Sequence, residues 1–210
     1  MTEAGILLQK QNIPDMTRTL RIILTLCLLA SAGTGAAQSI VRKSFARAAQ
    51  QIALMDSLAP ADRFPASWEH DGTTRYTSAK GWISGFFPAN IWFLYKYTRD
   101  PKWLDMARRR TAPLDTLRRY TKTHDLGFMV GCPCAAAYRL TGEEAYRQLL
   151  IDASDALLTR FSPAVGLIRS WDNKNGDPNP YRVIIDNMMN LEMLFTVSKQ
   201  IGRASCRERV

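Results

Sequence analysis

Apolar residues recur at helical spacing almost throughout residues 39–200 of this 210-residue chain, and no stretch alternates convincingly as a half-buried strand would. Pro101 suits the first turn of a helix, and Pro113 is expected to kink or split the helix that Pro101 begins. A loop rich in Gly, Asn, Asp and Pro spans residues 162–180. The spacing predicts helices around Ile40–Met55, over Ser84–Tyr97, from Pro101 through Leu117, and over Pro133–Leu140, Glu143–Arg160 and Asp186–Lys199.

A faint internal repeat groups these helices in pairs. Leu94–Trp103 resembles Tyr138–Tyr146, because in both an apolar helix ends at a Thr-x-acid turn and an aromatic-bearing helix follows. Thr98 and Thr141 are separated by the length of one helical hairpin. Such hairpins cannot bury their apolar faces alone and must stack. We therefore expect an all-α fold, roughly the first half of an (α/α)6 barrel, a toroid of helical hairpins; a free-standing helical bundle fits the same pattern.

The N-terminal 37 residues have the composition of an export signal. Met16–Arg21 is a short positive region, residues 22–29 form an apolar core, and small residues follow as far as Ala37. The apolar run is too short to span a bilayer as a helix. We expect residues 1–37 to be an over-long start plus a secretory signal beginning at Met16, and residues 38–200 to be a periplasmic or secreted bacterial domain. An N-terminal membrane anchor is the alternative, and no membrane contact is expected once a signal has been removed.

Residues 201–210 break the helical pattern with an Arg-rich run. This run resembles the translation of a short-read sequencing adapter, so we expect it not to be native. Cys206 would then carry no meaning. A genuine basic tail is the alternative.

The charge balance and the cysteines exclude some classes of function. The chain has 28 Lys and Arg against 19 Asp and Glu, a net charge of +9. Without residues 1–37 and 201–210, 22 basic and 16 acidic residues remain, a mild positive balance that suits an anionic substrate. No basic block is interleaved with aromatic residues as a nucleic-acid groove requires, so no nucleic acid is expected. Arg108, Arg109 and Arg110 are expected on a solvated helix face. Cys132 and Cys134 are expected to be small buried thiols, because a disulfide between them would be strained and no second pair completes a zinc site.

Two aspartates are the candidate catalytic residues. Asp186 lies at the start of the last expected helix among apolar neighbours, and Asp125 lies in a loop that continues to Gly127. Desolvation should raise the pKa of Asp186, as a proton donor needs, although a helix N-terminus favours the ionised form. Two such acids in aromatic surroundings indicate a sugar-cleaving site. The alternatives are a helix-capping role for Asp186 and a turn-forming role for Asp125.

Other polar and aromatic residues accompany the two acids. Trp82 and Trp171 are candidate stacking platforms for a sugar ring. His124 is suited to bind a sugar hydroxyl or carboxylate, or to cap a helix end. Asn190, four residues after Asp186, shares its helix face. The tryptophans at helical spacing are assigned to the core: Trp92 and Trp103.

Four motifs occur in a fixed order: Gly81-Trp-Ile-Ser-Gly-Phe-Phe-Pro88, His124-Asp-Leu-Gly-Phe128, Arg169-Ser-Trp171 and Ile184-Ile-Asp-Asn-Met-Met-Asn-Leu-Glu192. Together they resemble the unsaturated glucuronyl hydrolases, glycoside hydrolase family 88. The resemblance covers about Asp71 to Gln200. It implies an (α/α)6 barrel that releases Δ4,5-unsaturated uronic acid from polysaccharide-lyase products of glycosaminoglycans or similar polymers.

The resemblance also implies a mechanism. Asp186 is implied to protonate C4 of the enol-ether double bond, and it or water that it activates then delivers a hydroxyl group to C5, after which the hemiketal opens and expels the remaining sugar. Asp125 is implied to hold substrate hydroxyls and to tune Asp186. Trp82, Trp171 and His124 match substrate-contacting positions. No metal or organic cofactor is implied, in keeping with a chain that has two histidines.

The second half of the expected barrel has no counterpart in this sequence, including later His, Gln and Arg residues that contact the substrate in the family. We therefore expect the 210-residue polypeptide to be inactive and to expose apolar hairpin faces. Two alternative functions fit the same residues. One is an unsaturated rhamnogalacturonyl hydrolase acting on pectin fragments, and the other is a non-catalytic helical carbohydrate-binding or scaffold protein.

Overall fold

The computed structural model describes residues 16–172 and 181–201, with side chains for Leu20 and for residues 37–172 and 181–199. The expected over-long start and residues 202–210 lie outside the described residues. The chain divides into two units, Met1–Ala48 and Ala49–Val210, whose boundary lies within helix α1 (Met16–Leu58). Among the described residues, no helix has the length and apolar character needed to cross a membrane. The signal boundary at residue 37 stays a prediction.

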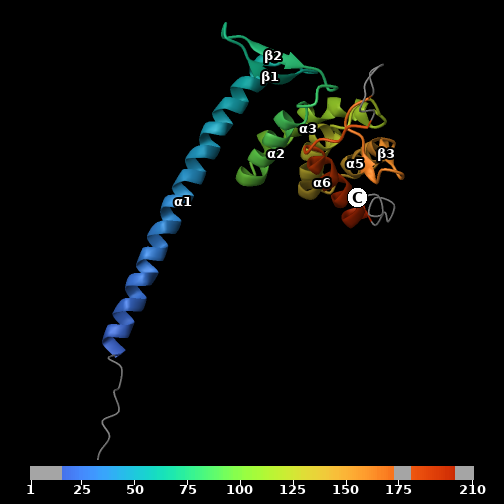
Figure 1. Ribbon diagram of the computed structural model, residues 1–210. Helices are drawn as coiled ribbons and strands as arrows, with labels where there is room; N and C mark the ends of the chain where they lie inside the picture. The colour runs from blue at the N-terminus through green and yellow to red at the C-terminus, as the bar shows by residue number, and fades with distance from the viewer. Residues whose placement is uncertain (1–15, 173–180, 202–210) are drawn as a thin grey trace, which may run out of the picture. The chain divides into compact units, whose positions relative to one another are not determined.

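The second unit consists mainly of helices paired through short turns (Figure 1). Helix α2 (Phe86–Thr98) is followed by α3 (Pro101–Thr111), and α4 (Cys132–Thr141) by α5 (Glu144–Leu158), before α6 (Asn187–Ile201). Helix α2 packs against both α3 and α4, and α5 packs against both α4 and α6. The mainly helical prediction is confirmed, with boundaries shifted by a few residues.

The turns within the two helix pairs share one construction, as the repeat predicted. The Oγ1 atoms of Thr98 and Thr141 donate to carbonyls four residues earlier, at 2.8 and 2.9 Å. The next residue is left-handed in both turns, Arg99 with φ 58° and Gly142 with φ 70°. This conformation closes a helix by redirecting the chain at its last carbonyls.

Two irregular helical segments lie between the pairs. Helix α3 ends at Thr111 and a 3-10 helix, η1 (Ala112–Leu117), follows it, so Pro113 splits the helix as expected. A π-helical segment, η2 (Gly127–Gly131), leads directly into α4. The helix that was predicted to start at Pro133 therefore begins earlier, immediately after the candidate acid loop.

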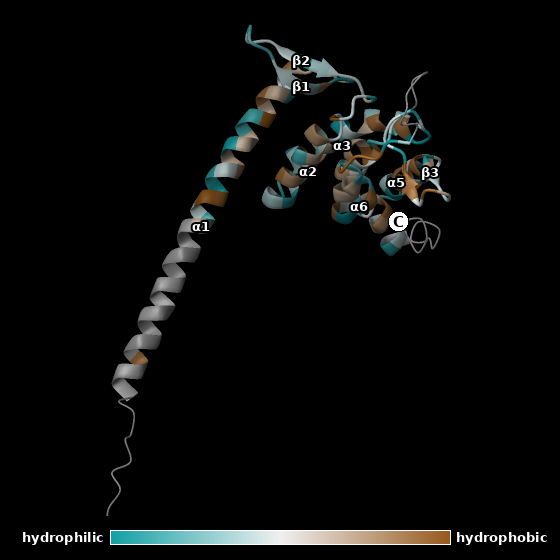
Figure 2. Ribbon diagram, in the orientation of Figure 1, coloured by the Kyte–Doolittle hydropathy of each residue, from teal (hydrophilic) through white to brown (hydrophobic). Residues whose placement is uncertain are grey.

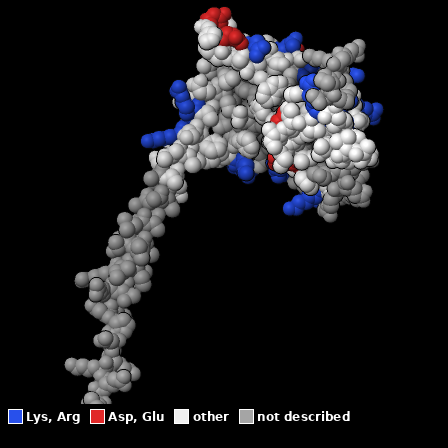
Figure 3. All heavy atoms as spheres, viewed as in Figure 1, with Lys and Arg blue, Asp and Glu red and all other residues white. Residues whose placement is uncertain are grey.

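Two short hairpins contradict the expectation of a chain without strands. Strand β1 (Phe64–Trp68) pairs antiparallel with β2 (Thr74–Thr77), and β3 (Phe161–Ser162) pairs with β4 (Leu167–Ile168). The register of the first pair shifts at a bulge, and β1 contains a proline, which hides its alternation. In Figure 3 acidic side chains gather at the tip of this first hairpin.

The core of the second unit lies between the helices, whose apolar residues are brown in Figure 2. Trp92 and Trp103 are 0% and 4% exposed, which confirms their assignment to the core. The Nε1 of Trp92 donates to Thr111 Oγ1 at 2.9 Å. Cys134 is buried and Cys132 half-buried, both free thiols as expected, and burial raises the pKa of Cys132 to about 11. Helices α2, α4 and α6 line a hollow of about 360 Å³.

Arg110 corrects the expectation that residues 108–110 form a solvated face, because its side chain is buried. Its guanidinium donates to the Asp56 carboxylate at 2.6 Å, and to three backbone carbonyls at the end of α1 at 2.6 to 2.9 Å. Arg108 and Arg109 are exposed as expected. Burial alone would raise the pKa of Asp56, but hydrogen bonds from Arg109 and Arg110 bring it below its ordinary value. A buried cation thus caps α1 and ties it to α3.

Candidate active site

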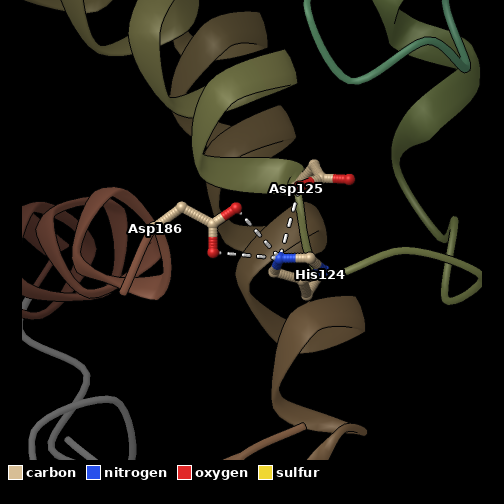
Figure 4. A group of neighbouring side chains, drawn as sticks. All are labelled: His124, Asp125 and Asp186. Atoms are coloured by element: carbon tan, nitrogen blue, oxygen red, sulfur yellow. Dashed lines mark hydrogen bonds and ion pairs between the residues drawn. The ribbon is translucent and has the colours of Figure 1, made fainter. Parts of the chain in front are cut away.

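His124, Asp125 and Asp186 come together from two segments that are far apart in the sequence (Figure 4). The His124 Nε2 atom lies 3.3 and 3.4 Å from the two carboxylate oxygens of Asp186, and 3.4 Å from Asp125 Oδ1. One potential metal-ligand atom from each residue, a ring nitrogen or a carboxylate oxygen, lies within 4.8 Å of the other two. The fold therefore unites both acids and the histidine that the sequence singled out.

The surroundings of His124 indicate which ring nitrogen carries the proton. The side chain is 2% exposed, and its Nδ1 is buried without a partner among the described residues. A buried N–H without an acceptor is costly, whereas Nε2 faces carboxylate oxygens of both aspartates. The tautomer with hydrogen on Nε2 therefore satisfies the site best, and this hydrogen is shared between the two acids.

Asp125 is held by its own loop, immediately before η2. Thr123 Oγ1 donates to Asp125 Oδ2 at 2.6 Å, and the Asp125 N–H donates back to Thr123 Oγ1 at 3.1 Å. The Asp125 carbonyl accepts from the N–H groups of Phe128 and Met129, both at 3.0 Å. Sequence reasoning missed Thr123, although a Thr two residues before an Asp is a recognised local hydrogen-bonding pattern.

Asp186 immediately precedes α6, and its carboxylate is directed at His124. The expected desolvation by apolar neighbours is not found, because Ile185 and Met188 are 86% and 61% exposed. The Asp186 side chain itself is 35% exposed. Its immediate electrostatic surroundings are thus His124 and Asp125 instead of apolar walls, and a ligand is able to reach it.

Trp82 and Trp171 are 55% and 47% exposed, as stacking platforms require. The Trp171 ring meets the His124 ring edge-on, with centroids 6.4 Å apart and an interplanar angle of 82°. Trp82 packs edge-on against Phe86 and Phe128, at 6.0 and 5.9 Å. Phe128, which Trp82 contacts, lies three residues after Asp125, and Trp171 contacts His124. Both indoles therefore pack against residues next to the acids.

Asn190 lies where no open surface reaches it. It is 0% exposed, its Oδ1 accepts from the Gly127 N–H at 2.8 Å, and its Nδ2 donates to Asn187 Oδ1 at 2.9 Å. Its helix brings it against the loop of the other acid, a contact that sequence spacing alone did not reveal. The predicted contact between Asn190 and substrate stays a prediction.

Arg160 is a further site residue that sequence reasoning missed. This buried side chain donates to the carbonyls of Thr121 and Ser170, both at 3.1 Å. It therefore joins the segment before His124 to the segment before Trp171. A basic residue near the end of a helix usually interacts with the last carbonyls of that helix. Nothing in the sequence around Arg160 therefore indicated that it joins two other segments.

The three clustered residues also form a donor set that could hold a metal ion. One imidazole nitrogen and two carboxylates suit several divalent ions. The same separations of 3.3 to 3.4 Å also fit long hydrogen bonds from one Nε2–H to two carboxylates. A chelator distinguishes a metal centre from a metal-free pair of acids.

Known proteins resemble this chain over part of their length. An unsaturated glucuronyl hydrolase of Formosa agariphila is 38% identical over 125 residues, which are 59% of this chain and 31% of that protein. One from Bacillus sp. is 32% identical over 146 residues, 67% of this chain and 38% of that protein. The crystal structure of an unsaturated glucuronyl hydrolase specific for heparin matches with a TM-score of 0.74 and 36% identity, over 80% of this chain and 44% of that chain. No protein-family model matches the chain.

The chain spans less than half the length of each of these relatives. The match to the solved structure confirms the expected fold, a helical arrangement corresponding to about half of an α/α barrel. By sequence and by fold, this chain is a relative of the unsaturated glucuronyl hydrolases and corresponds to part of their length.

Proposed function

We propose that this chain forms part of a hydrolase that releases Δ4,5-unsaturated uronic acid from the oligosaccharides that polysaccharide lyases produce. The observation that carries the proposal is the cluster of His124, Asp125 and Asp186, in which one Nε2 lies within 3.4 Å of both carboxylates. Two half-exposed indoles accompany this cluster. Sugar-processing sites combine such acid pairs with aromatic stacking surfaces.

In this proposal Asp186 donates a proton to C4 of the unsaturated ring, and the positive charge develops at C5. Water then adds to C5 and gives up a proton to the Asp186 carboxylate, which restores the acid. The resulting hemiketal opens and releases the remaining sugar. Asp125, fixed by Thr123, binds substrate hydroxyl groups and keeps a second negative charge beside the proton donor.

The separation of the two acids supports this assignment. Inverting glycosidases place their carboxyl groups roughly 6.5–9.5 Å apart to hold a water between them. Here the closest oxygens of Asp125 and Asp186 are within 4.8 Å. The two acids are therefore closer together than direct inverting displacement requires, which leaves hydration of the double bond or a retaining displacement.

The names of the relatives suggest the class of substrate. A relative from Streptococcus agalactiae, 32% identical over 132 residues, is an unsaturated chondroitin disaccharide hydrolase. A solved relative at 27% identity, from Bacillus sp. GL1, is an unsaturated glucuronyl hydrolase responsible for the degradation of glycosaminoglycan. We infer that unsaturated oligosaccharides derived from glycosaminoglycans are the substrates of this protein. We also infer, from residues 16–37, that it is exported from a bacterial cell.

The test uses the complete reading frame that contains these residues, alongside the 210-residue chain. Each is given unsaturated disaccharides from chondroitin, heparin and rhamnogalacturonan, and loss of the ultraviolet absorbance of the double bond is followed. The complete protein should consume a glycosaminoglycan disaccharide, and the 210-residue chain should consume none. Activity on the rhamnogalacturonan product alone would overturn the substrate assignment, and no activity on any of them would overturn the proposed function.

A chelator completes this test. The side chains of the proposed mechanism move the proton without a metal, so dialysis against EDTA should leave the rate unchanged. A rate that is lost on dialysis and restored by a divalent ion would instead show that a metal ion takes part, with His124, Asp125 and Asp186 as its candidate ligands.

A further inference from the structure

Asp125 and Asp186 belong to different segments, and something must fix the distance between them. Asn190 makes a buried side-chain hydrogen bond that joins the Asp125 loop to helix α6. Asn190 Oδ1 accepts from Gly127 N–H at 2.8 Å, two residues after Asp125. Asn190 Nδ2 donates to Asn187 Oδ1 at 2.9 Å, one residue after Asp186.

The network continues from Asn187 to the segment that carries Trp171. Asn187 Nδ2 donates to the Ile168 carbonyl at 2.9 Å and to Ser170 Oγ at 3.2 Å. Ser170 Oγ also accepts from the Ile184 N–H at 3.0 Å, in the segment that leads to the second acid. Asn190, Asn187 and Ser170 are 0%, 7% and 1% exposed, so water does not compete for these bonds.

The orientation of both amides follows from their partners. A backbone N–H can only donate, so the group that faces Gly127 must be the oxygen of Asn190. The Asn190 nitrogen then faces the Asn187 oxygen, and the Asn187 nitrogen faces the Ile168 carbonyl, which can only accept. Each donor meets an acceptor along the whole path. An aspartate at position 190 would lose its donor and place its second oxygen against the Asn187 oxygen, and an aspartate at position 187 would place an oxygen against the Ile168 carbonyl.

Close backbone packing shows independently that the acid loop and α6 are in contact. A Cβ atom built on Gly127 would lie 2.6 Å from the Met189 carbonyl oxygen and 2.7 Å from the Asn190 Cα. No side chain fits in this space, so the loop touches the helix through its backbone. The amide bonds therefore act across a rigid contact and not across a gap.

We propose, building on the proposed function, that Asn190 and Asn187 are positioning residues that set the separation of Asp125 and Asp186. They touch neither reacting atom. Their effect passes through the backbone of Gly127 to Asp125, and through the start of α6 to Asp186. Ser170 extends the same path to Trp171. One buried network therefore fixes the relative positions of both acids and of the Trp171 ring.

The test is Asn190→Asp in the complete protein, which keeps the acceptor for Gly127 and removes the donor to Asn187. A misplaced carboxylate should lower kcat by roughly 10- to 100-fold, while KM changes much less. Because Asn190→Asp also adds a carboxylate, the pH–rate profile is compared in Ser170→Ala, which adds no charge; it should shift there because the coupling between two acids depends on their separation. The matched control is Thr111→Val, which removes a buried hydrogen bond between α2 and α3 and should lower Tm while leaving kcat and the pH profile unchanged.

A wild-type kcat in Asn190→Asp, or a wild-type pH profile in Ser170→Ala, would overturn the proposal, whatever the Tm of the variant. Should Asn190→Asp not fold, Ser170→Ala removes only one hydroxyl from the network and should cause a smaller loss of kcat together with the shift of profile; an unchanged profile counts against the proposal. If the wild-type protein hydrolyses no unsaturated disaccharide, the proposed function fails on its own. Crystal structures of the wild type and Asn190→Asp then decide, because an unchanged arrangement of Asp125, His124 and Asp186 would refute positioning.

Discussion

Two clusters in this chain join acids and bases from distant segments, and they are built in opposite ways. Around Arg110, the Asp56 carboxylate receives two guanidinium groups, and further N–H groups of Arg110 bind carbonyls at the end of α1. Around His124, one imidazole lies between two carboxylates, and its Nδ1 has no partner among the described residues. In the first cluster two cations share one carboxylate and the buried guanidinium has acceptors for its donors, whereas in the second two carboxylates face one imidazole.

This difference separates a scaffold contact from a reactive one. A buried cation with all its donors used has nothing to offer a ligand. Two carboxylates that share one donor, one of them 35% exposed, keep lone pairs available and repel each other. Functional sites commonly accept such a loss of stability. Substitutions in the two clusters should therefore have separable effects on activity and on stability.

The largest effect should come from Asp186→Asn in the complete protein. Asparagine keeps the size of the side chain but cannot deliver a proton, so kcat should fall by roughly 10²- to 10⁴-fold. Stability should be unchanged or higher, because the repulsion from Asp125 is removed. Initial rates on an unsaturated disaccharide and thermal unfolding measure the two quantities. A variant that loses stability along with activity would erase the contrast between the clusters.

Arg110→Met should have the next largest effect, on stability alone. It leaves the Asp56 carboxylate and several carbonyls of α1 without their buried donor, and breaking one side of a buried pair costs about 3–5 kcal/mol. The control is Arg109→Met, which removes an exposed partner of the same carboxylate and should cost about 0–1 kcal/mol. Urea unfolding gives both values. Equal costs for the two variants would mean that the burial of Arg110 contributes nothing.

The fold was largely predictable because its signals are local. Helical spacing, Pro113 and the Thr-x-acid turns each act within a few residues, and all three appear in the structure. The strands were missed although Asp71 and Gly72 form the strongest short hairpin signal, since β1 carries Pro65 and a bulge. Attention to that dipeptide would have found the first hairpin.

The candidate site was predictable in part. Asp125, Asp186 and His124 were identifiable by their residue types and motifs, and the fold does unite them. Their support comes from contacts across long sequence separations, such as Arg160 with Thr121 and Asn190 with Gly127. Helical periodicity shows which face a residue occupies but not which loop lies against it. Buried polar partners therefore appear only in three dimensions.

The pH dependence of stability should also separate the clusters. Hydrogen bonds from Arg109 and Arg110 outweigh burial and hold the pKa of Asp56 below its ordinary value of 3.8. Since the folded state binds this proton more weakly than the unfolded state, the stabilisation is complete above the unfolded pKa and disappears as pH falls through the folded one. Asp56→Asn should be less stable than wild type at neutral pH, and the difference should narrow on acidification between about pH 5 and pH 2. A difference that stays constant over this range would show that the carboxylate charge is not what stabilises α1.

The smallest effect is expected where an ion pair is neither buried nor part of the site. Arg108 of α3 donates to Oε1 of Glu143, the residue before α5, at 2.7 Å, and the two side chains are 46% and 37% exposed. Water screens such a pair and the long side chains lose freedom in forming it, so Arg108→Met should cost less than about 1 kcal/mol and leave kcat unchanged. Added salt should remove even this difference, whereas the cost of Arg110→Met should persist in salt because its partner is buried. Unfolding of both variants is measured at low and at high ionic strength. If the loss of stability in Arg108→Met did not depend on salt, solvent exposure would not explain why this ion pair contributes less than the one at Arg110.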